Sequence, residues 1–163
     1  MKKFKNVFFL VSLTLLCSII ASGQGASTGS QTPAYDAELA KKVGADDYGM
    51  RNYVFCILKT GPKDAAITDK KQRDEIFAGH MANIQRLAGE GKLALAGPFG
   101  KNDRTYRGLF IFNVATVGEA QKLVETDPVI KSGMMTAELT PWYGSAATML
   151  INENHKKVMK KSF

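Results

Sequence analysis

The stretch HMANIQRLAGEGKLALAGPF, residues 80–99, contains the end of one helix, a glycine-bounded turn and one strand. Apolar residues recur at helical spacing from residue 69 to residue 88, and this predicted helix ends at Gly89 and Gly91. The segment KLALAGPF that follows has the composition of a strand. A helix that leads directly into a strand is therefore the unit on which the rest of the fold is built.

Three further strands flank this unit. NYVFCILKTGP (52–62) is rich in aromatic and branched residues, RGLFIFNV (107–114) follows a polar turn, and MMTAELTPW (134–142) can form the last strand. A second helix is predicted before that last strand, because Thr116 and Glu119 have the spacing of a capping box. The predicted order, β-α-β-β-α-β, is the ferredoxin-like arrangement, an α+β fold with an antiparallel sheet and two helices on one face.

The strand at 52–62 is apolar on both of its faces. Side chains that point one way alternate with side chains that point the other way, namely Tyr53, Phe55 and Ile57 against Val54, Cys56 and Leu58. Helices cover only one face of such a sheet, so the second face is expected to meet another sheet or another subunit. We therefore expect a homodimer that buries the helix-free face, and a buried Cys56.

Residues 1–23 have the order of a secretory signal peptide, with lysines first, an apolar run at 7–20 and small residues last. The run is shorter than the roughly 20 residues of a membrane span. We therefore expect cleavage after Gly23 and a periplasmic or secreted protein with no stable membrane anchor. An uncleaved anchor and a lipoprotein attached at Cys17 are the alternatives, although Leu16 stands where the lipid-attachment motif has a small residue.

The remaining chain divides into three parts. Residues 24–49 are expected to form a linker with a short helix at 36–42, residues 50–145 the domain, and residues 146–163 a basic C-terminal tail. The net charge of the whole chain is +7, but most of it lies in the signal peptide and the tail. The body carries only about +1, which gives no reason to expect a nucleic-acid partner.

Several kinds of chemistry are missing from the sequence. The two histidines, His80 and His155, are far apart and have no cysteine pair nearby, so no metal site is predicted. GEGKLALAG (89–97) lacks the glycine spacing and the Ser or Thr of a phosphate-binding loop. YGSAAT (143–148) has Ala147 where a nucleophile elbow needs glycine. We therefore expect neither a cofactor nor a serine hydrolase.

Two polar residues are the candidate site. His80 lies four residues after Ile76 and four before Ile84, so its ring projects from the apolar side of the helix. Asp127 precedes Pro128 and could cap a short turn, but the second helix runs beside the first and could also bring this carboxylate to His80. Such a contact would fix the tautomer of the imidazole and stabilise the ring after proton uptake. A histidine that is merely packed and bonded to a backbone carbonyl is the alternative.

From about residue 52 to residue 144 the chain resembles the YciI-like (YCII-related) domain family, within the dimeric α/β-barrel superfamily. The resemblance is carried by GHMANIQRLAGEGKLALAGPF, RGLFIFNVAT, GEAQKLVETDPVIKSG and ELTPW. It implies the ferredoxin-like fold, a homodimer paired sheet to sheet, and His80 with Asp127 as the active-site pair. At least one branch of the family removes chloride from a chlorinated hydroxyquinol, whereas many members lack an export signal or a segment like 34–50.

Three functions remain open. The first is an exported enzyme in which His80 is a general acid/base oriented by Asp127 and acts on a small aromatic or enol-like molecule. The second is a non-catalytic module that binds a small anion or phenol in the same cleft, with Phe99 and Trp142 as its walls. The third is a structural dimer with a filled core. A filled, dry site at His80 would exclude the first two functions.

Overall fold

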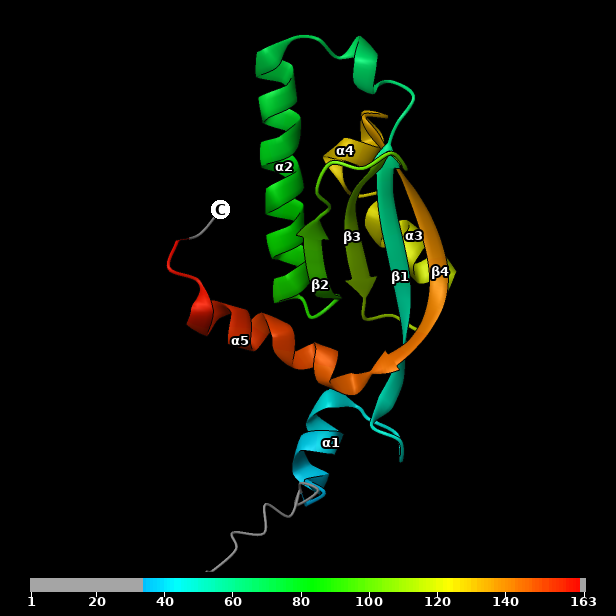
Figure 1. The fold of residues 1–163 in the computed structure, drawn as a ribbon, viewed down its shortest axis with the longest axis vertical. Helices are drawn as coiled ribbons and strands as arrows, with labels where there is room; N and C mark the ends of the chain where they lie inside the picture. The colour runs from blue at the N-terminus through cyan, green and yellow to red at the C-terminus, as the bar shows by residue number, and fades with distance from the viewer. Residues whose placement is uncertain (1–33, 162–163) are drawn as a thin grey trace, which may run out of the picture. The chain divides into compact units, whose positions relative to one another are not determined.

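A four-stranded antiparallel sheet forms the centre of the computed structural model, which describes residues 34–161. The predicted signal peptide (1–23), with Cys17, and the first part of the predicted linker, residues 24–33, lie outside the described residues. The elements of the domain are β1 (Met50–Thr60), η1 (Asp64–Ala66), α2 (Lys70–Gly89), β2 (Leu93–Pro98), β3 (Tyr106–Phe112), α3 (Val117–Val124), α4 (Pro128–Lys131) and β4 (Met135–Ser145), as Figure 1 shows.

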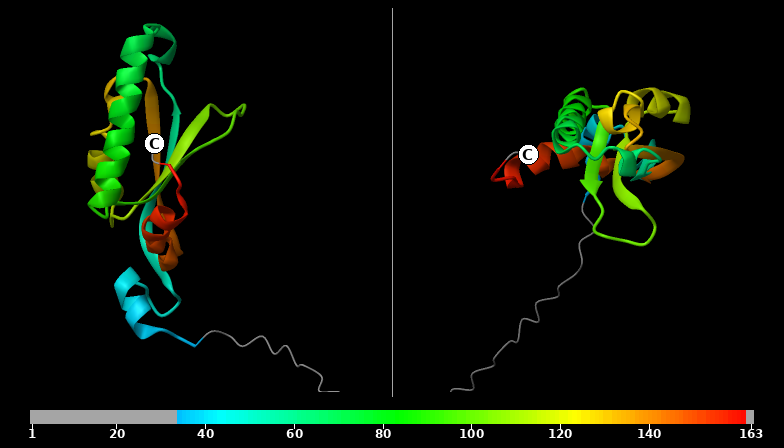
Figure 2. Two further views of the ribbon diagram at one scale, coloured as in Figure 1. Left: turned by 90° about the vertical axis from the view of Figure 1, so that its left-hand side faces the viewer. Right: turned by 90° about the horizontal axis from the view of Figure 1, so that it is seen from above.

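The strand order β2-β3-β1-β4 is that of the ferredoxin-like fold predicted from the sequence. β1 pairs with β4 along its whole length, from Met50 opposite Ser145 to Thr60 opposite Met135. The helices α2, α3 and α4 lie on one face of the sheet, and the end of the β2–β3 hairpin projects from the other face (Figure 2). The second helix of the motif is split into α3 and α4, because Pro128 starts a new helix directly after Asp127.

The main core lies between the sheet and the helices. Val54, Cys56 and Leu58 of β1 are at most 2% exposed and pack in one cluster with residues of β3 and of the helices. Burial raises the pKa of the Cys56 thiol to about 12, and the neighbouring Asp127 charge acts in the same direction. Cys56 is therefore a small apolar core residue, as the sequence predicted.

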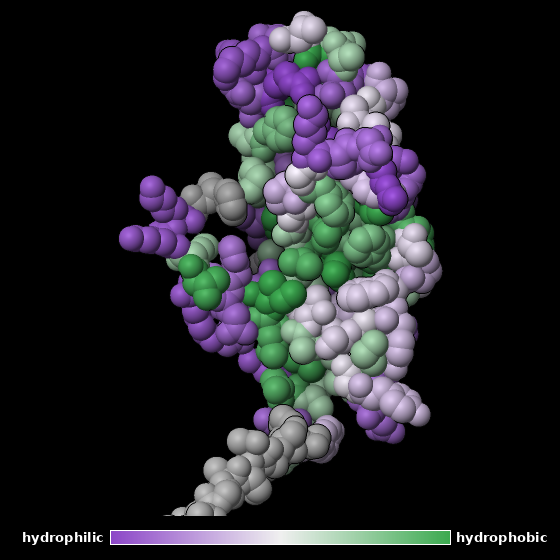
Figure 3. All heavy atoms as spheres, in the orientation of Figure 1, coloured by the Kyte–Doolittle hydropathy of each residue, from purple (hydrophilic) through white to green (hydrophobic). Residues whose placement is uncertain are grey.

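The helix-free face of the sheet carries a second apolar cluster. Tyr53, Ala94 and Ile111 are buried in it, and Phe55 is among the half-buried residues that pack against them. Figure 3 views this face and shows apolar residues gathered over the middle of the sheet and continuing toward its lower end. A large apolar surface of this kind is seldom left in water by a monomeric protein.

The chain on either side of the sheet forms further helices. The predicted short helix is present as α1 (Ala37–Val43), capped by Asp36 and ended by Gly44, which has a φ of 66°. The segment after β4 is more ordered than a basic tail, since it forms η2 (Ala146–Leu150) and α5 (Ile151–Val158). An ion pair between Lys42 and Glu153 at 2.9 Å joins α1 to α5. Among the described residues, no helix is both long and apolar enough to cross a membrane.

Candidate functional site

His80 lies in the middle of α2 and points into the layer between this helix and the sheet. Its ring stacks on Phe110 of β3, with ring centroids 5.9 Å apart, and the Phe77 ring approaches at 6.3 Å with an edge-on geometry. The side chain is 11% exposed. Two aromatic residues therefore hold the imidazole in a fixed plane.

Asp127 lies between α3 and α4 and is fully buried. Its Oδ1 atom accepts a hydrogen bond of 3.1 Å from the backbone N–H of Val129, so Asp127 is the N-cap of α4 and Pro128 is the first helical residue. Asp127 is also the partner of His80, the second role that the sequence allowed for it, because the same carboxylate contacts the imidazole. The Nδ1 atom of His80 lies 2.8 Å from Oδ2 and 3.0 Å from Oδ1.

The hydrogen bonds around Asp127 define which ring nitrogen of His80 carries the proton. The Asp127 carboxylate accepts from Val129 and also from Nδ2 of Asn83, at 3.3 Å from Oδ2. A carboxylate that receives these donors is ionised and can only accept. Nδ1 of His80 therefore donates to it, and in the neutral ring the free lone pair is on Nε2.

The Nε2 atom of His80 is not completely buried. Arg51 Nε is the one buried side-chain nitrogen or oxygen atom within residues 34–161 that lacks a hydrogen-bond partner. His80 bonds only through Nδ1 among these residues, so its partnerless Nε2 atom is not buried. The ring is thus held on its inner side, whereas Nε2 keeps a small exposure, and neither of the two surface depressions described below includes His80.

The close approach of α2 and α4 depends on Gly79. A Cβ atom at this position would lie 2.8 Å from Cγ of Pro128, closer than side-chain atoms normally come. Because Gly79 precedes His80 and Pro128 follows Asp127, this contact sets the separation of the two functional residues. Glycine here leaves room for the proline ring, and the carboxylate comes within hydrogen-bond reach as a result.

The structure does not bring Phe99 and Trp142 to the His80–Asp127 pair. Trp142 pairs with Tyr53 across β4 and β1, and their rings pack 5.4 Å apart on the helix-free face. Phe99 follows β2 at the hairpin end, where it packs on Tyr106 and lines an open surface depression of about 460 Å³. The expectation that they wall the same cleft as His80 is therefore not met within one copy of the chain.

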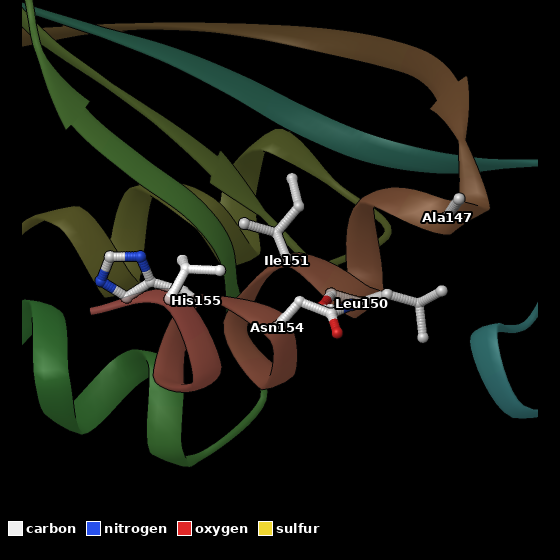
Figure 4. Close-up of a pocket in the computed structure, with 6 residues that line it drawn as sticks. Ala147, Leu150, Ile151, Asn154 and His155 are labelled. Atoms are coloured by element: carbon white, nitrogen blue, oxygen red, sulfur yellow. Dashed lines mark hydrogen bonds between the residues drawn. The ribbon is translucent and has the colours of Figure 1, made fainter. Parts of the chain in front are cut away.

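A second open depression, of about 450 Å³, lies at the C-terminal segment. Residues of η2 and α5 line it, among them Leu150, Ile151 and His155 (Figure 4). None of its lining residues is acidic, so His155 has no carboxylate partner there. In the part of the chain that the structure describes, no group of three or more His, Cys, Asp or Glu side chains is placed to hold a metal ion.

Asn83 belongs to the site but was missed from the sequence. It is 7% exposed and lies one helical turn after His80, with its amide on Asp127. Its position three residues after His80, on the apolar side of the helix, was the available signal. A buried polar residue on the apolar side of a helix requires a hydrogen-bond partner. Two such residues one turn apart therefore indicate a single partner that both of them contact.

The chain is similar to one protein family and to solved structures. A family model described as YCII-related domain matches residues 53–143. Among curated proteins, no sequence matches the chain. A solved structure from Burkholderia phenoliruptrix AC1100, described as 5-chloro-2-hydroxyhydroquinone dehydrochlorinase in complex with 2,5-dihydroxybenzoquinone, is 23% identical. That match covers 55% of this chain and 92% of that chain, with a TM-score of 0.39.

Replacement of Gly79 tests the close approach of α2 and α4. Alanine normally stabilises a helix by up to about 1 kcal/mol relative to glycine. Here the added Cβ meets Pro128, so Gly79→Ala is expected to lower the free energy of unfolding by roughly 1–3 kcal/mol. The matched control is Gly89→Ala in the same helix, because a Cβ atom at Gly89 would have no neighbouring atom within 4 Å. Urea unfolding of both variants measures the difference, and equal stability would show that α4 does not need this gap.

Proposed function

Because the chain belongs to the YCII-related domain family, we propose that it is a small-molecule enzyme with His80 as its general acid/base group. The observation that supports this most directly is the asymmetry of the imidazole. Nδ1 is bonded to a fully buried carboxylate, whereas Nε2 is not completely buried and has no protein partner among the described residues. A histidine that is oriented on one nitrogen and free on the other is the arrangement that general acid/base catalysis requires.

The proposed chemistry is a proton transfer at Nε2. A substrate O–H or C–H group that reaches Nε2 gives its proton to the lone pair, and the ring becomes a cation. The Asp127 carboxylate, 2.8 Å away on the other side, balances the new charge in surroundings that are largely apolar. The ring then returns the proton to the product or to a leaving group, so that the enzyme ends in its initial state.

The substrate class follows from the surroundings of the ring and from acidity. The half-buried ring of Phe77 lies beside His80 and favours a flat, apolar molecule next to the imidazole. A phenolic hydroxyl has an ordinary pKa of about 10, within reach of an imidazole base, whereas that of water is about 15.7. We therefore propose a small hydroxylated aromatic or enol-like substrate.

Substitution of the pair tests this function. Turnover of a panel of small hydroxylated aromatic and enol-like compounds is followed by NMR, with circular dichroism as a check on folding. His80→Ala is expected to remove nearly all activity, since no other group near the substrate takes the proton. Asp127→Asn should lower the rate by a factor on the order of 10²–10⁴, because orientation and charge balance are lost.

The control is His155→Gln, which changes the other histidine and should leave turnover unchanged. Full activity in His80→Ala would disprove the proposal. Compounds that bind at His80 but are never converted would instead identify a ligand-binding module.

We further propose that two copies pair through the helix-free face of the sheet. Phe55 and Ile57 are only half-buried there, and Trp142 is 36% exposed beside them. Figure 3 shows apolar residues gathered on this face, and a second copy of the same face would remove them from water.

A lysine on that face tests the dimer. Ile57→Lys places a charge in the proposed interface, and the desolvation of this charge opposes association. Light scattering is expected to show a dimer for the wild-type protein and a monomer for Ile57→Lys. Gln85→Lys, on the exposed side of α2, is the control and should remain dimeric. A wild-type protein that is monomeric at every concentration would contradict the proposal.

Export is proposed from the sequence of residues 1–23. We expect a mature chain that begins at Gln24, because the small residues after the apolar run have the pattern of a cleavage site. N-terminal sequencing of protein recovered from the periplasmic or secreted fraction measures this. Retention of Met1, or a lipid on Cys17, would contradict it.

A further inference from the structure

We propose that Asn83 is a positioning residue for the His80–Asp127 pair, and that Arg86 sets the direction of its amide. The catalytic consequence rests on the function proposed above, but the geometry can be tested without a substrate. Asn83, His80 and Arg86 all lie on α2, within two turns of one another. One side of this helix therefore carries three of the four residues in this series of contacts.

The first step is the contact between Asn83 and Asp127. Nδ2 of Asn83 donates to Oδ2 of the carboxylate at 3.3 Å, the oxygen that also accepts the 2.8 Å bond from His80. The backbone N–H of Val129 holds the other oxygen. With donors on both oxygens, the carboxylate cannot rotate away from His80 without losing bonds.

The second step is the direction of the Asn83 amide. Its Oδ1 atom accepts from Nη2 of Arg86 at 2.7 Å. A guanidinium group has only donors, so the amide atom that faces Arg86 must be the oxygen. The amide NH₂ is thereby turned toward Asp127. In the reversed orientation, the amide oxygen would face the carboxylate oxygen.

These contacts form a directed series from the half-exposed Arg86 to the ring of His80. Arg86 orients Asn83, Asn83 orients the Asp127 carboxylate, and that carboxylate accepts a hydrogen bond from Nδ1. In the neutral ring this arrangement leaves the lone pair on Nε2, the nitrogen without a protein partner among the described residues. Asn83 thus acts through Asp127 and touches no reacting atom.

The exchange of the His80 Nδ1 proton with water tests the proposal directly. Nitrogen-edited NMR of protein with labelled histidine measures this rate. In Asn83→Leu the carboxylate loses one donor, so the Nδ1–H bond opens more often and the proton should exchange about tenfold faster. Asn83→Asp is a second variant of the same shape. It keeps an acceptor for Arg86 but removes the donor, and faster exchange is expected again.

Three controls separate positioning from general loss of structure. Gln85→Ala changes an exposed neighbour on α2 and should exchange at the wild-type rate. Arg86→Leu should accelerate exchange, because the amide is free to turn, whereas Arg86→Lys retains a donor and should restore the slow rate. Wild-type exchange in both Asn83 variants would overturn the proposal.

A kinetic measurement adds the catalytic consequence. With a substrate in hand, Asn83→Leu should lower kcat about tenfold and leave KM within about twofold, since ground-state binding does not involve the amide. The two proposals fail differently. Unchanged proton exchange in the Asn83 variants would remove the positioning role and leave His80 as the acid/base group. Fully active His80→Ala would remove the acid/base function and leave the exchange result standing.

Discussion

The buried carboxylate of Asp127 is the constraint on which the helical layer depends. An ionised group without exposure to water is strongly unfavourable unless hydrogen bonds replace its hydration. Here the N-terminus of α4, the Asn83 amide and the His80 ring supply that replacement from two separate helices. The placement of α2 against α4 is therefore fixed by polar contacts as well as by apolar packing, and any shift between these helices leaves the charge less well solvated.

Local signals in the sequence were sufficient for most of the fold and for the pair itself. The Thr116–Glu119 capping box and the Asp127–Pro128 start of α4 both need only a few neighbouring residues, and both are present in the structure. His80 was placed correctly on the inner side of its helix because helical spacing fixes the direction of a side chain. From the sequence, capping of the short turn and contact with His80 were alternative roles for Asp127. One carboxylate has enough acceptor sites for both roles.

The remaining features depend on contacts between distant residues. Trp142 could not be assigned to a face, since a change of one residue in the register of β4 would move it to the other side of the sheet. The role of Gly79 follows only from the nearness of Pro128, which belongs to another helix. The tail after β4 was interpreted from its lysines, whereas apolar residues at helical spacing, such as Ala147 and Ile151, mark the structure that forms there.

The pairing of β1 with β4 has a consequence for the order of folding. β1 is the first strand of the domain and lies inside the sheet, but one of its two neighbours is the last strand to be synthesised. Until β4 arrives, one whole edge of β1 has unpaired backbone groups, and its apolar side chains lack part of their cover. Pairing of β4 with β1 closes the long segment of chain between them, which is a slow step in folding. The sheet is therefore completed late, and the incomplete form is prone to aggregate. In this topology the edge of β1 that pairs with β4 stays open until residues 135–145 are available.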